Sequence, residues 1–499
     1  MHAQTESLIS EELVFCGLNP KTLPIIKNLI KAIEYGHTAL ILKEEQLQLF
    51  ATLPDDVLQL LSVYEGRLQI QRHHKQEKRV ARKLLSMVEH KTSANNPSAL
   101  MPGADESQKC AIDGAVENKL AFILGGPGTG KTSTAAAIVL GKLLQCKKPK
   151  KISLVAPTGK AAVQLSTSFR KAVSQSRTSF KPSDFPEATT IHRQLDTLNS
   201  ADIVLVDEAS MISLDLMDRL LATLGPHAHL ILMGDPNQLA SIEAGSILST
   251  IANSTQLNNC RFTLTERHRI DGEQFLIQLQ NSCLAGDPEQ FFQILKSNPK
   301  TLIEYGEEAI LHEYIKSAYT EYIQNLSRNH FTEPKFQVLT STRYGLGGQK
   351  WVNQLMIDTL AQSGFYGKGN RFLVTTNQAM LGIYNGDIGY QVNDPDESDP
   401  MIHFLQLDKT IRKSQILGLE LAFAISIYRS QGSEYEDICI SLNQKSGATP
   451  FQPTRELLYT ALTRAKRNIV IYASKPQIEI ALTNPTRRLN CLELFLEKN

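Results

Sequence analysis

The stretch GGPGTGKTS, Gly125 to Ser133, follows the apolar run LAFIL directly and leads into a helix-forming segment. Glycines allow backbone N–H groups to converge on a phosphate, and the N-terminus of the following helix adds positive potential. The spacing Gly125-x-x-x-x-Gly130-Lys131-Thr132 matches the P-loop, whose lysine reaches the β/γ-phosphates and whose Thr hydroxyl can ligate Mg²⁺. The residues predicted to hold a nucleotide are Gly125, Gly126, Pro127, Gly128, Thr129, Gly130, Lys131, Thr132 and Ser133.

Two later strand ends carry polar residues that suit hydrolysis. DIVLVDEASM ends an apolar strand in Asp207 and Glu208. A carboxylate at this place can hold Mg²⁺ through water together with Thr132, and the adjacent Glu can act as general base. LILMGDPNQL is a second apolar strand that ends in polar residues, and its Gln238 could contact the γ-phosphate and respond when that phosphate is lost. Taken alone, an Asp-Glu pair also suits a helix N-cap, and GDPN is also an ordinary turn sequence.

The second half of the chain has no P-loop, yet it carries Arg269 in LTERHR and Arg464 in TALTRAK. If the nucleotide lies between two lobes, these arginines can supply positive charge to the transition state from across the cleft. The alternative is that they form structural salt bridges at the surface.

Two strand-to-helix loops offer groups that suit a phosphate backbone. Pro157 to Lys160 and Thr190 to Arg193 would lie on the face away from the nucleotide, with backbone amides, hydroxyls and cations in a row. The residues predicted to bind single-stranded nucleic acid here are Pro157, Thr158, Lys160, Thr190 and His192. Each loop alone could also be a plain connection.

Short apolar strands alternate with helical stretches in the first half of the chain. LAFIL, a helix from Lys131 to about Cys146, ISLVA, DIVLV and LILMG together predict a parallel sheet covered by helices. QVLTST, DICISL and NIVIYAS predict a second α/β region. Residues 370–423, with a tight turn at Asn385-Gly386, predict a small β-barrel inserted in that second region.

The first 90 residues or so carry helical patterning. In the segment from Arg67 to Lys91, Ala81, Leu84, Leu85 and Val88 form one apolar stripe, and the other face is basic. That face is either solvated or a surface for a partner or nucleic acid. Residues 91–108 are rich in Ser, Asn, Pro and Gly and predict a linker. The predicted domains are 1–95 (helical, partner-docking), 96–265 (first lobe), 266–369 with 424–499 (second lobe), and 370–423 (inserted barrel).

The composition limits the possible classes of protein. A chain of 499 residues is too long to fold around a single hydrophobic core, so several domains are expected. Lys+Arg 52 against Asp+Glu 51 gives a net charge of +1, so any nucleic-acid binding must come from local patches. The scattered cysteines favour reduced thiols without a zinc site. Without a leader-like N-terminus or an apolar run approaching ~20 residues, a cytoplasmic protein with no membrane partner is expected.

The motifs occur in the order GGPGTGKT, LVAPTGKAA, TTIHRQL, DEAS, GDPNQL, LTERHR, SQGSE and LLYTALTRAK. This series resembles superfamily 1 helicases, and within them the RecD family, the alpha subunit of bacterial exodeoxyribonuclease V. NGDIG at 385–389 and the closing TRRLNCLELF favour RecD, and the resemblance covers roughly residues 100–490. It implies an α/β fold with two RecA-like P-loop lobes, an SH3-like β-barrel insertion, a helical N-terminal domain, and ATP with Mg²⁺ as cofactors.

The resemblance also implies roles for single residues. It assigns Arg269 and Arg464 to the γ-phosphate, Gln108 to the adenine, and the SQGSE segment with Ser430 and Gln431 to the coupling of DNA with the nucleotide. RecD proteins usually show His-Lys before SQGSE, whereas this chain has Tyr428-Arg429. A tyrosine can still stack on a base and an arginine can still contact phosphate. His268 stands where related helicases often place a tyrosine that stacks on the adenine.

The implied function is an ATP-dependent 5′→3′ DNA helicase or translocase. It would act on single-stranded DNA and DNA ends in double-strand break repair and homologous recombination, beside RecB-like and RecC-like subunits that carry the nuclease. Two alternatives stay open. One is a stand-alone superfamily 1 DNA or RNA helicase. The other is a structural or regulatory subunit with an inactive ATP site, against which the intact P-loop lysine and arginines argue.

Overall fold

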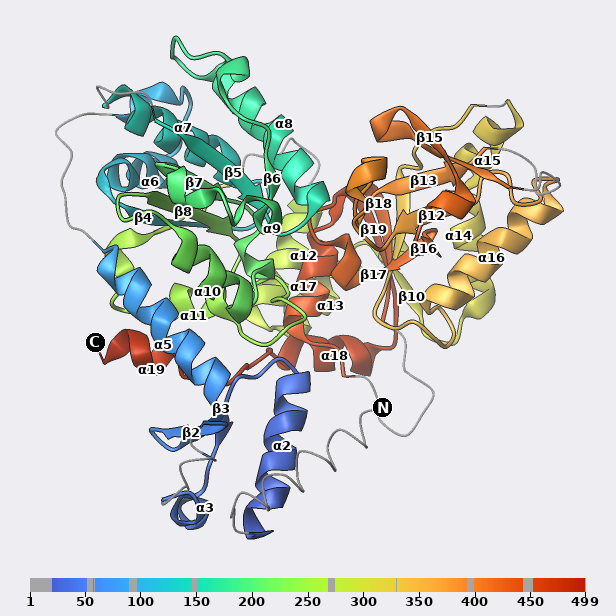
Figure 1. Ribbon diagram of the computed structural model, residues 1–499. Helices are drawn as coiled ribbons and strands as arrows, with labels where there is room; N and C mark the ends of the chain where they lie inside the picture. Colours follow the sequence, from blue (N-terminus) through green and yellow to red (C-terminus); the bar gives the residue numbers. More distant parts are fainter. Residues whose placement is uncertain are drawn as a thin grey trace.

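The computed structural model describes residues 20–51, 57, 59–88, 97–145, 150–267, 274–328, 330–392, 399–442 and 452–498. Two parallel sheets, each flanked by helices, form two lobes, and an antiparallel sheet adjoins the second lobe (Figure 1). A smaller N-terminal unit lies beside the first lobe. The predicted α/β class with helix-covered parallel sheets is confirmed.

The first lobe is a parallel sheet in the order β6-β5-β7-β8-β4-β9, and its strands read as continuous apolar runs because both faces are covered. Its strands are β4 (Leu120–Leu124), β5 (Ile152–Ala156), β6 (Thr189–Thr190), β7 (Ile203–Val206), β8 (His229–Gly234) and β9 (Arg261–Thr263). Its helices are α6 (Glu106–Glu117), α7 (Lys131–Leu144), α8 (Gly159–Gln175), α9 (Ile191–Gln194), α10 (Leu214–Thr223) and α11 (Ile247–Asn253). One face of the sheet packs against α6, α7 and α8, and the other against α10 and α11.

The second lobe is a parallel sheet in the order β10-β19-β18-β11-β17. Its strands are β10 (Leu302–Glu304), β11 (Phe336–Thr340), β17 (Ala424–Ser426), β18 (Tyr435–Ser441) and β19 (Ala465–Ala473). One face is covered by α12 (Gln274–Ala285), α13 (Pro288–Lys296), α17 (Arg455–Leu462) and α18 (Lys475–Thr483). The other face is covered by α14 (Glu308–Ala318), α15 (Thr320–Ser327) and α16 (Gln349–Gln362).

The inserted segment is an antiparallel sheet in the order β15-β14-β13-β12-β16. Its strands are β12 (Arg371–Val374), β13 (Ile388–Gln391), β14 (Met401–Phe404), β15 (Lys409–Arg412) and β16 (Leu419–Leu421). Among the described residues β15 and β16 are its edges, so the sheet is an open ladder and a closed SH3-like barrel stays a prediction. A turn forms at Asn385-Gly386, where the Asp387 N–H donates to the Tyr384 carbonyl at 3.0 Å, but a longer loop separates it from β12.

The N-terminal unit is not purely helical, so that prediction is wrong. It contains α2 (Leu23–Glu34), α3 (Glu44–Leu49) and an antiparallel sheet of β1 (Leu40–Ile41), β3 (Arg67–Ile70) and β2 (Leu61–Tyr64). The helix predicted to start at Arg67 begins at Gln71 as α5 (Gln71–Ser86), because RLQI pairs with LSVY through a turn at Glu65-Gly66. Strand pairing is a contact that helical periodicity does not detect.

Two segments pack against the first lobe rather than in their predicted domains. The apolar stripe of α5, including Ala81 and Leu84, joins the same core as α10, and so do Leu492 and Phe495 of α19 (Leu492–Glu497). The predicted domains 1–95 and 424–499 therefore each contain a helix that belongs to the core of the first lobe. The end of the predicted linker is also structured, because Pro97 and Ser98 are buried and α6 begins at Glu106. The basic face of α5 stays exposed, with ion pairs from Arg72 and Arg79 to α10.

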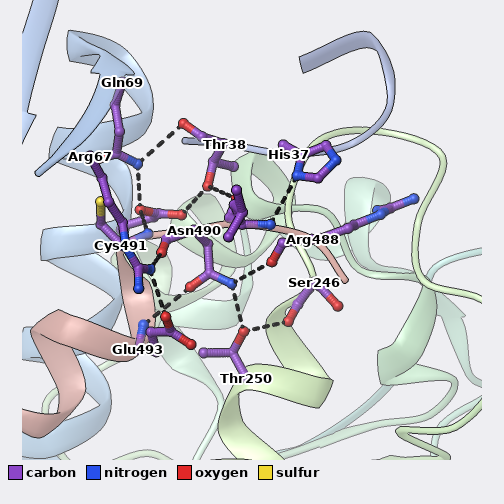
Figure 2. A network of polar contacts seen from close by, with 12 residues as sticks. His37, Thr38, Arg67, Gln69, Ser246, Thr250, Arg488, Asn490, Cys491 and Glu493 are labelled. Carbon is purple, nitrogen blue, oxygen red and sulfur yellow. Dashed lines mark hydrogen bonds and ion pairs between the residues drawn. The ribbon is translucent and has the colours of Figure 1, made fainter. Parts of the chain in front are cut away.

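The segment that links α18 to α19, residues 484–490, crosses from the second lobe to the first; we call it the C-terminal crossover. Figure 2 shows its end, where the Asn490 amide donates to Thr250 Oγ1 at 3.1 Å and Arg67 donates to the Asn490 carbonyl. Just beyond it, the Cys491 N–H donates to the carboxyl of Glu77 at 2.9 Å. The N-terminal unit, α5 and the chain end are thus held together by polar contacts.

We expect Glu77→Ala to destabilise this junction. Glu77 is 1% exposed and accepts from Thr38 Oγ1 at 2.6 Å, from Gln69 Nε2 at 2.7 Å and from the Cys491 N–H. Removing the carboxyl takes the main acceptor from three buried donors, of which Thr38 and Gln69 keep only the Leu489 and Thr38 carbonyl oxygens, at 3.4 Å and 3.3 Å. At ~1 kcal/mol for each donor, the thermal midpoint of a chain of this length should fall by about 3 °C. Scanning calorimetry measures it.

Glu77→Gln is the informative second variant. Its amide oxygen can accept from Gln69 and Cys491, and the Thr38 hydroxyl can turn to accept from the new N–H. Burial raises the pKa of Glu77, so the substitution also removes a carboxyl whose charged form is disfavoured. We expect a midpoint near wild type for Glu77→Gln and for Glu45→Ala, an exposed control on α3. An equal fall of the thermal midpoint in both Glu77 variants would contradict the assigned role of these hydrogen bonds.

Candidate functional site

The P-loop joins β4 to α7 at the carboxyl edge of the first sheet. Gly128 and Gly130 have φ of 75° and 77°, a left-handed conformation that glycine adopts without strain. The second of them immediately precedes α7, so the free N–H groups at the start of this helix border the turn. This geometry forms an anion cradle from backbone groups.

Lys131 is held inside the loop by the loop's own backbone. Its ammonium donates to the carbonyl oxygens of Gly125 at 2.8 Å and Gly126 at 2.9 Å. The Thr129 hydroxyl closes the turn by donating to the Gly126 carbonyl at 2.9 Å. The lysine is therefore placed at the cradle, where its positive charge can reach a bound phosphate.

The two carboxylates follow β7, which is separated from β4 by one strand, β8, at the same edge of the sheet. The Glu208 N–H donates to Asp207 Oδ1 at 2.8 Å, and the Glu208 backbone is left-handed with φ of 51°. Such a conformation is strained for a non-glycine residue and is often retained at functional sites. Burial and the charge of Glu208 raise the pKa of Asp207, and the Lys131 ammonium opposes that shift.

Gln238 follows β8 and is buried. Its Nε2 lies 3.4 Å from Asp235 Oδ2, whereas its Oε1 has no hydrogen-bond partner among the described residues. A buried amide oxygen without a donor is costly, and it suits a group that a ligand or an ordered water completes.

A cavity of about 280 Å³ between the lobes collects these groups; we call it the P-loop cavity. From the first lobe it is lined by Pro127, Gly128, Gly130, Lys131, Thr132, Ser133, Asp207, Glu208, Asp235 and Gln238. From the second lobe, Gly432, Glu434 and Arg464 line it. The structure thus brings most of the predicted nucleotide-binding and catalytic side chains to one place.

Arg464 is 3% exposed, and backbone and hydroxyl groups of the second lobe fix its position. Its Nε donates to the Thr460 carbonyl at 3.0 Å, Nη1 to the Ser433 carbonyl at 3.1 Å and Nη2 to Thr463 Oγ1 at 3.0 Å. Three of the guanidinium's donors are thereby used, which leaves its remaining N–H groups for the cavity. Arg269 and His268 lie outside the described residues.

Gln108 does not line a cavity beside the P-loop, contrary to its predicted contact with the adenine. It is fully buried, its Oε1 accepts from the Asp105 N–H at 3.1 Å and its Nε2 donates to the Thr129 carbonyl at 3.1 Å. This side chain is the second half of a capping box at the start of α6. Through its hydrogen bond to Thr129, Gln108 links the start of α6 to the P-loop.

A larger cavity of about 580 Å³ opens on the other side of the P-loop. Gly125, Gly126 and Thr129 line it together with Thr265, Arg267, Asn281 and Tyr459. It is the space in which a base attached to phosphates in the P-loop cavity can lie. Arg267, Asn281 and Tyr459 are polar groups there that the motif pattern did not single out.

A third cavity of about 580 Å³ lies between the first lobe, the inserted sheet and the second lobe; we call it the strand-end cavity. It is lined by the predicted residues Pro157, Thr158, Lys160, His192, Tyr428 and Gln431. Asn385 and Gly386 line it from the inserted sheet. Residues from stretches that are far apart in the sequence therefore border one space, and several of them are cationic or aromatic.

Thr190 and Ser430 do not fit their predicted roles. Thr190 is 8% exposed in β6 and is not among the residues that line the strand-end cavity. Ser430 is fully buried, and its hydroxyl donates to the Ile427 carbonyl at 2.7 Å. Both residues are therefore internal in this structure. Neither can meet an outside ligand in this conformation.

Gln431 lies between the two lobes. Its Nε2 donates to the Leu239 carbonyl at 2.8 Å, and the Leu239 N–H donates to Thr460 Oγ1 at 2.8 Å. Tyr459 also crosses the cleft, donating to Asp235 Oδ2 at 3.0 Å. The loop that starts at Asp235 is therefore bound to the second lobe at several points.

A further contact between lobes involves Arg193 and Tyr384. Arg193 donates to the Tyr384 hydroxyl at 2.7 Å, and its guanidinium carbon lies 4.3 Å from the centre of that ring. This contact joins α9 to the inserted sheet, next to His192 and Asn385 of the strand-end cavity. Sequence reasoning missed Tyr384, and the NGDIG run that follows it is the signal that could have pointed there.

Two family models match the chain. The AAA domain matches residues 108–244, and the UvrD-like helicase C-terminal domain matches residues 421–472. The first match ends within the loop that follows Gln238, and the second includes Gln431 and Arg464.

Curated relatives align over most of the chain. The RecBCD enzyme subunit RecD of Mycobacterium tuberculosis is 28% identical over 476 residues, which cover 88% of this chain and 82% of that protein. The protein of the same name from Haemophilus influenzae is 27% identical over 475 residues, covering 78% and 72%. The ATP-dependent RecD2 DNA helicase of Deinococcus radiodurans is 27% identical over 479 residues, covering 90% and 60%.

Proposed function

Because this chain belongs to the RecD family of superfamily 1 helicases, we propose that it is an ATP-dependent DNA helicase of a RecBCD-type complex. The observation that carries the proposal is the P-loop cavity, where Lys131 and the Asp207-Glu208 pair of one lobe face Arg464 of the other. A cavity shared by two lobes couples hydrolysis to their relative movement, which is what a motor requires.

The residues present fit ATP with Mg²⁺. The backbone cradle at Gly128 and Gly130 suits phosphates, and the unpartnered Gln238 oxygen suits a water or phosphate-bound ligand. Thr132 and Asp207 would hold Mg²⁺, as hard oxygen ligands that this ion prefers. When bound, ATP with Mg²⁺ supplies the phosphoanhydride whose hydrolysis releases free energy.

The chain's own residues would divide the work of hydrolysis. Glu208 would take the proton of the attacking water, and Gln238 Oε1 would accept a hydrogen bond that orients it. Lys131 and Arg464 would place positive charge where negative charge develops, from opposite sides of the cleft. Arg269 would add to this charge.

Single-stranded DNA would lie in the strand-end cavity. Lys160 and His192 would contact phosphates, and Tyr428, 36% exposed, would stack on a base. Arg429 is less available than predicted, because it donates to Glu420 at 2.6 Å and 3.3 Å. Translocation with 5′→3′ polarity is part of the proposal and follows from family membership.

The partners would be RecB-like and RecC-like subunits, with the nuclease on one of them. The N-terminal unit would dock onto these subunits, and the inserted sheet, SH3-like in the proposal, would help hold the strand. The complex would act on DNA ends in double-strand break repair and homologous recombination in the cytoplasm. No helix among the described residues is both long and apolar enough to cross a membrane.

A stand-alone DNA helicase is the second candidate. It is favoured by the likeness to the RecD2 helicase of Deinococcus radiodurans, which covers 90% of this chain. Stable co-purification with two large subunits would exclude it. An RNA substrate stays open because the phosphate-contacting groups do not select ribose or deoxyribose. An inactive subunit is disfavoured, because Lys131, Glu208 and Arg464 all line the P-loop cavity.

The test is steady-state ATP hydrolysis by the purified chain, with and without a single-stranded oligodeoxynucleotide. We expect stimulation on the order of tenfold, as for typical coupling between two sites. An oligoribonucleotide of the same sequence tests the choice of nucleic acid. If the folded chain binds ATP but does not respond to DNA, even with its partner subunits added, the motor function is wrong.

A further inference from the structure

The C-terminal crossover is attached to the second lobe at its start. The Arg455 N–H donates to the Asn484 carbonyl at 3.0 Å, and the Thr486 N–H donates to the Glu456 carboxyl at 2.8 Å. Arg455 and Glu456 belong to the first turn of α17, the helix that also carries Tyr459 and Thr460. The crossover therefore moves with α17.

Arg488, two residues further on, contacts the first lobe. Its Nη1 donates to the carbonyl oxygens of Ser241 at 2.7 Å, Gly245 at 2.9 Å and Glu243 at 3.2 Å. Three carbonyls of one loop converge on one nitrogen, so the guanidinium fixes the shape of residues 241–245. Figure 2 shows Arg488 beside Ser246, where this loop ends and α11 begins.

The N-terminal unit closes around the same guanidinium. Gly36 has φ of 86°, and a side chain there would place its Cβ 2.5 Å from Arg488 Cζ, so only glycine fits. The Gly245 N–H donates to the Gly36 carbonyl at 3.0 Å, and the Leu489 N–H donates to His37 Nδ1 at 3.0 Å. Arg488 thus lies where all three units of the chain meet.

The loop that Arg488 holds connects two functional cavities. Its first part, with Asp235 and Gln238, lines the P-loop cavity, and its Leu239 is bound by Gln431 and Thr460 of the second lobe. Further on, Ser241, Ile242 and Glu243 line the strand-end cavity, with Ile242 75% exposed. One end of the loop faces the nucleotide site and the other faces the proposed DNA site.

We propose that Arg488 is a positioning residue that couples the strand-end cavity to hydrolysis, by tying the loop 239–245 to the second lobe through the C-terminal crossover. The inference rests on the proposed function and deepens it. The loop is attached to the second lobe at Leu239 and, through Arg488, at residues 241–245. A change in the angle between the lobes then moves both ends of the loop together, and DNA bound against Ile242 resists or favours that movement.

The experiment compares three variants of the full chain. Arg488→Ala removes the tie, Arg488→Lys keeps one cationic nitrogen that can donate to the same carbonyls, and Arg487→Ala removes the adjacent, exposed arginine as a matched control. For each, the basal ATPase rate, KM for ATP and the rate at saturating oligodeoxynucleotide are measured. Hydrogen exchange of the backbone amides at 239–246 is followed without any ligand.

With Arg488→Ala we expect DNA stimulation to fall on the order of tenfold. The basal rate and KM should stay within about twofold, because Arg488 does not line the P-loop cavity. Exchange at 239–246 should accelerate by about tenfold as the loop loses its attachment. Arg488→Lys should recover much of the DNA stimulation and of the slow exchange at 239–246, and Arg487→Ala should match wild type in both measurements.

Three results would overturn the inference. The first is full DNA stimulation in Arg488→Ala. The second is an equal fall of basal and stimulated rates with a rise in KM, which indicates a purely structural role. The third is unchanged exchange at 239–246. If wild type itself does not respond to DNA, the proposed function fails, and the exchange data still decide whether Arg488 positions the loop.

Discussion

We expect Lys131→Gln to abolish ATP turnover, with kcat lower by about a thousandfold, because one strong positive charge at the transferring phosphate is lost. The ammonium occupies the P-loop through two carbonyls, Gly125 and Gly126, and a glutamine amide can still donate to one of them. The loop should therefore keep its shape while losing its charge. Steady-state ATPase assays with and without single-stranded DNA measure the effect.

Lys131 does not line the strand-end cavity, so the affinity of Lys131→Gln for single-stranded DNA should stay within about twofold of wild type. Fluorescence anisotropy of a labelled oligodeoxynucleotide tests this. Lys171→Gln, an exposed lysine on α8, is the matched control and should hydrolyse ATP normally. Normal turnover by Lys131→Gln would show that the P-loop assignment is mistaken.

We expect Arg464→Ala to lower kcat by about a thousandfold, the lower end of the range for an arginine that acts across a nucleotide cleft. KM for ATP should change less than about threefold, because the interaction strengthens only as charge develops in the transition state. The geometry supports this separation, since the hydrogen bonds that hold Arg464 among the described residues all go to Thr460, Ser433 and Thr463 of the second lobe.

Two comparisons make the Arg464 result specific. Arg464→Lys keeps the charge without the planar fork and should recover only part of the rate. Arg467→Ala removes an exposed arginine that pairs with Asp437 at 3.0 Å, and it should leave the rate unchanged. If nucleotide binding, hydrolysis and the thermal midpoint of Arg464→Ala all decline together, the arginine serves folding rather than the transition state.

Local sequence was enough to predict candidate site residues where a site is built from residues that are close together in the chain. The P-loop works through consecutive backbone groups, so its spacing alone identified Lys131 and Thr132. The apolar runs before Asp207 and Gln238 predicted strands whose ends meet at one edge of a parallel sheet, and the P-loop cavity contains both residues. The absence of a second P-loop made Arg464 a candidate to act across a cleft, and the family resemblance assigned it to the γ-phosphate; it lines the same cavity from the second lobe.

Sequence reasoning failed where burial decides the role of a polar side chain. Gln108, Thr190 and Ser430 have the right types and spacing for ligand contacts, yet packing turns each of them inward. Gln108 braces Thr129, and Ser430 satisfies the carbonyl of Ile427. Whether a polar group meets a ligand or the protein's own backbone depends on elements that are distant in sequence.

By itself the sequence determined which residues we propose for the chemistry of this protein: a phosphate cradle, paired carboxylates and a second lobe with its own arginine, because these depend on residue type and short spacing. Only the tertiary structure decided how the parts are joined. The chain end returns to the first lobe, Glu77 unites it with the N-terminal unit, and Arg488 holds the loop between the two cavities. These contacts join residues hundreds of positions apart, and no local pattern encodes them because they exist only once both lobes have folded.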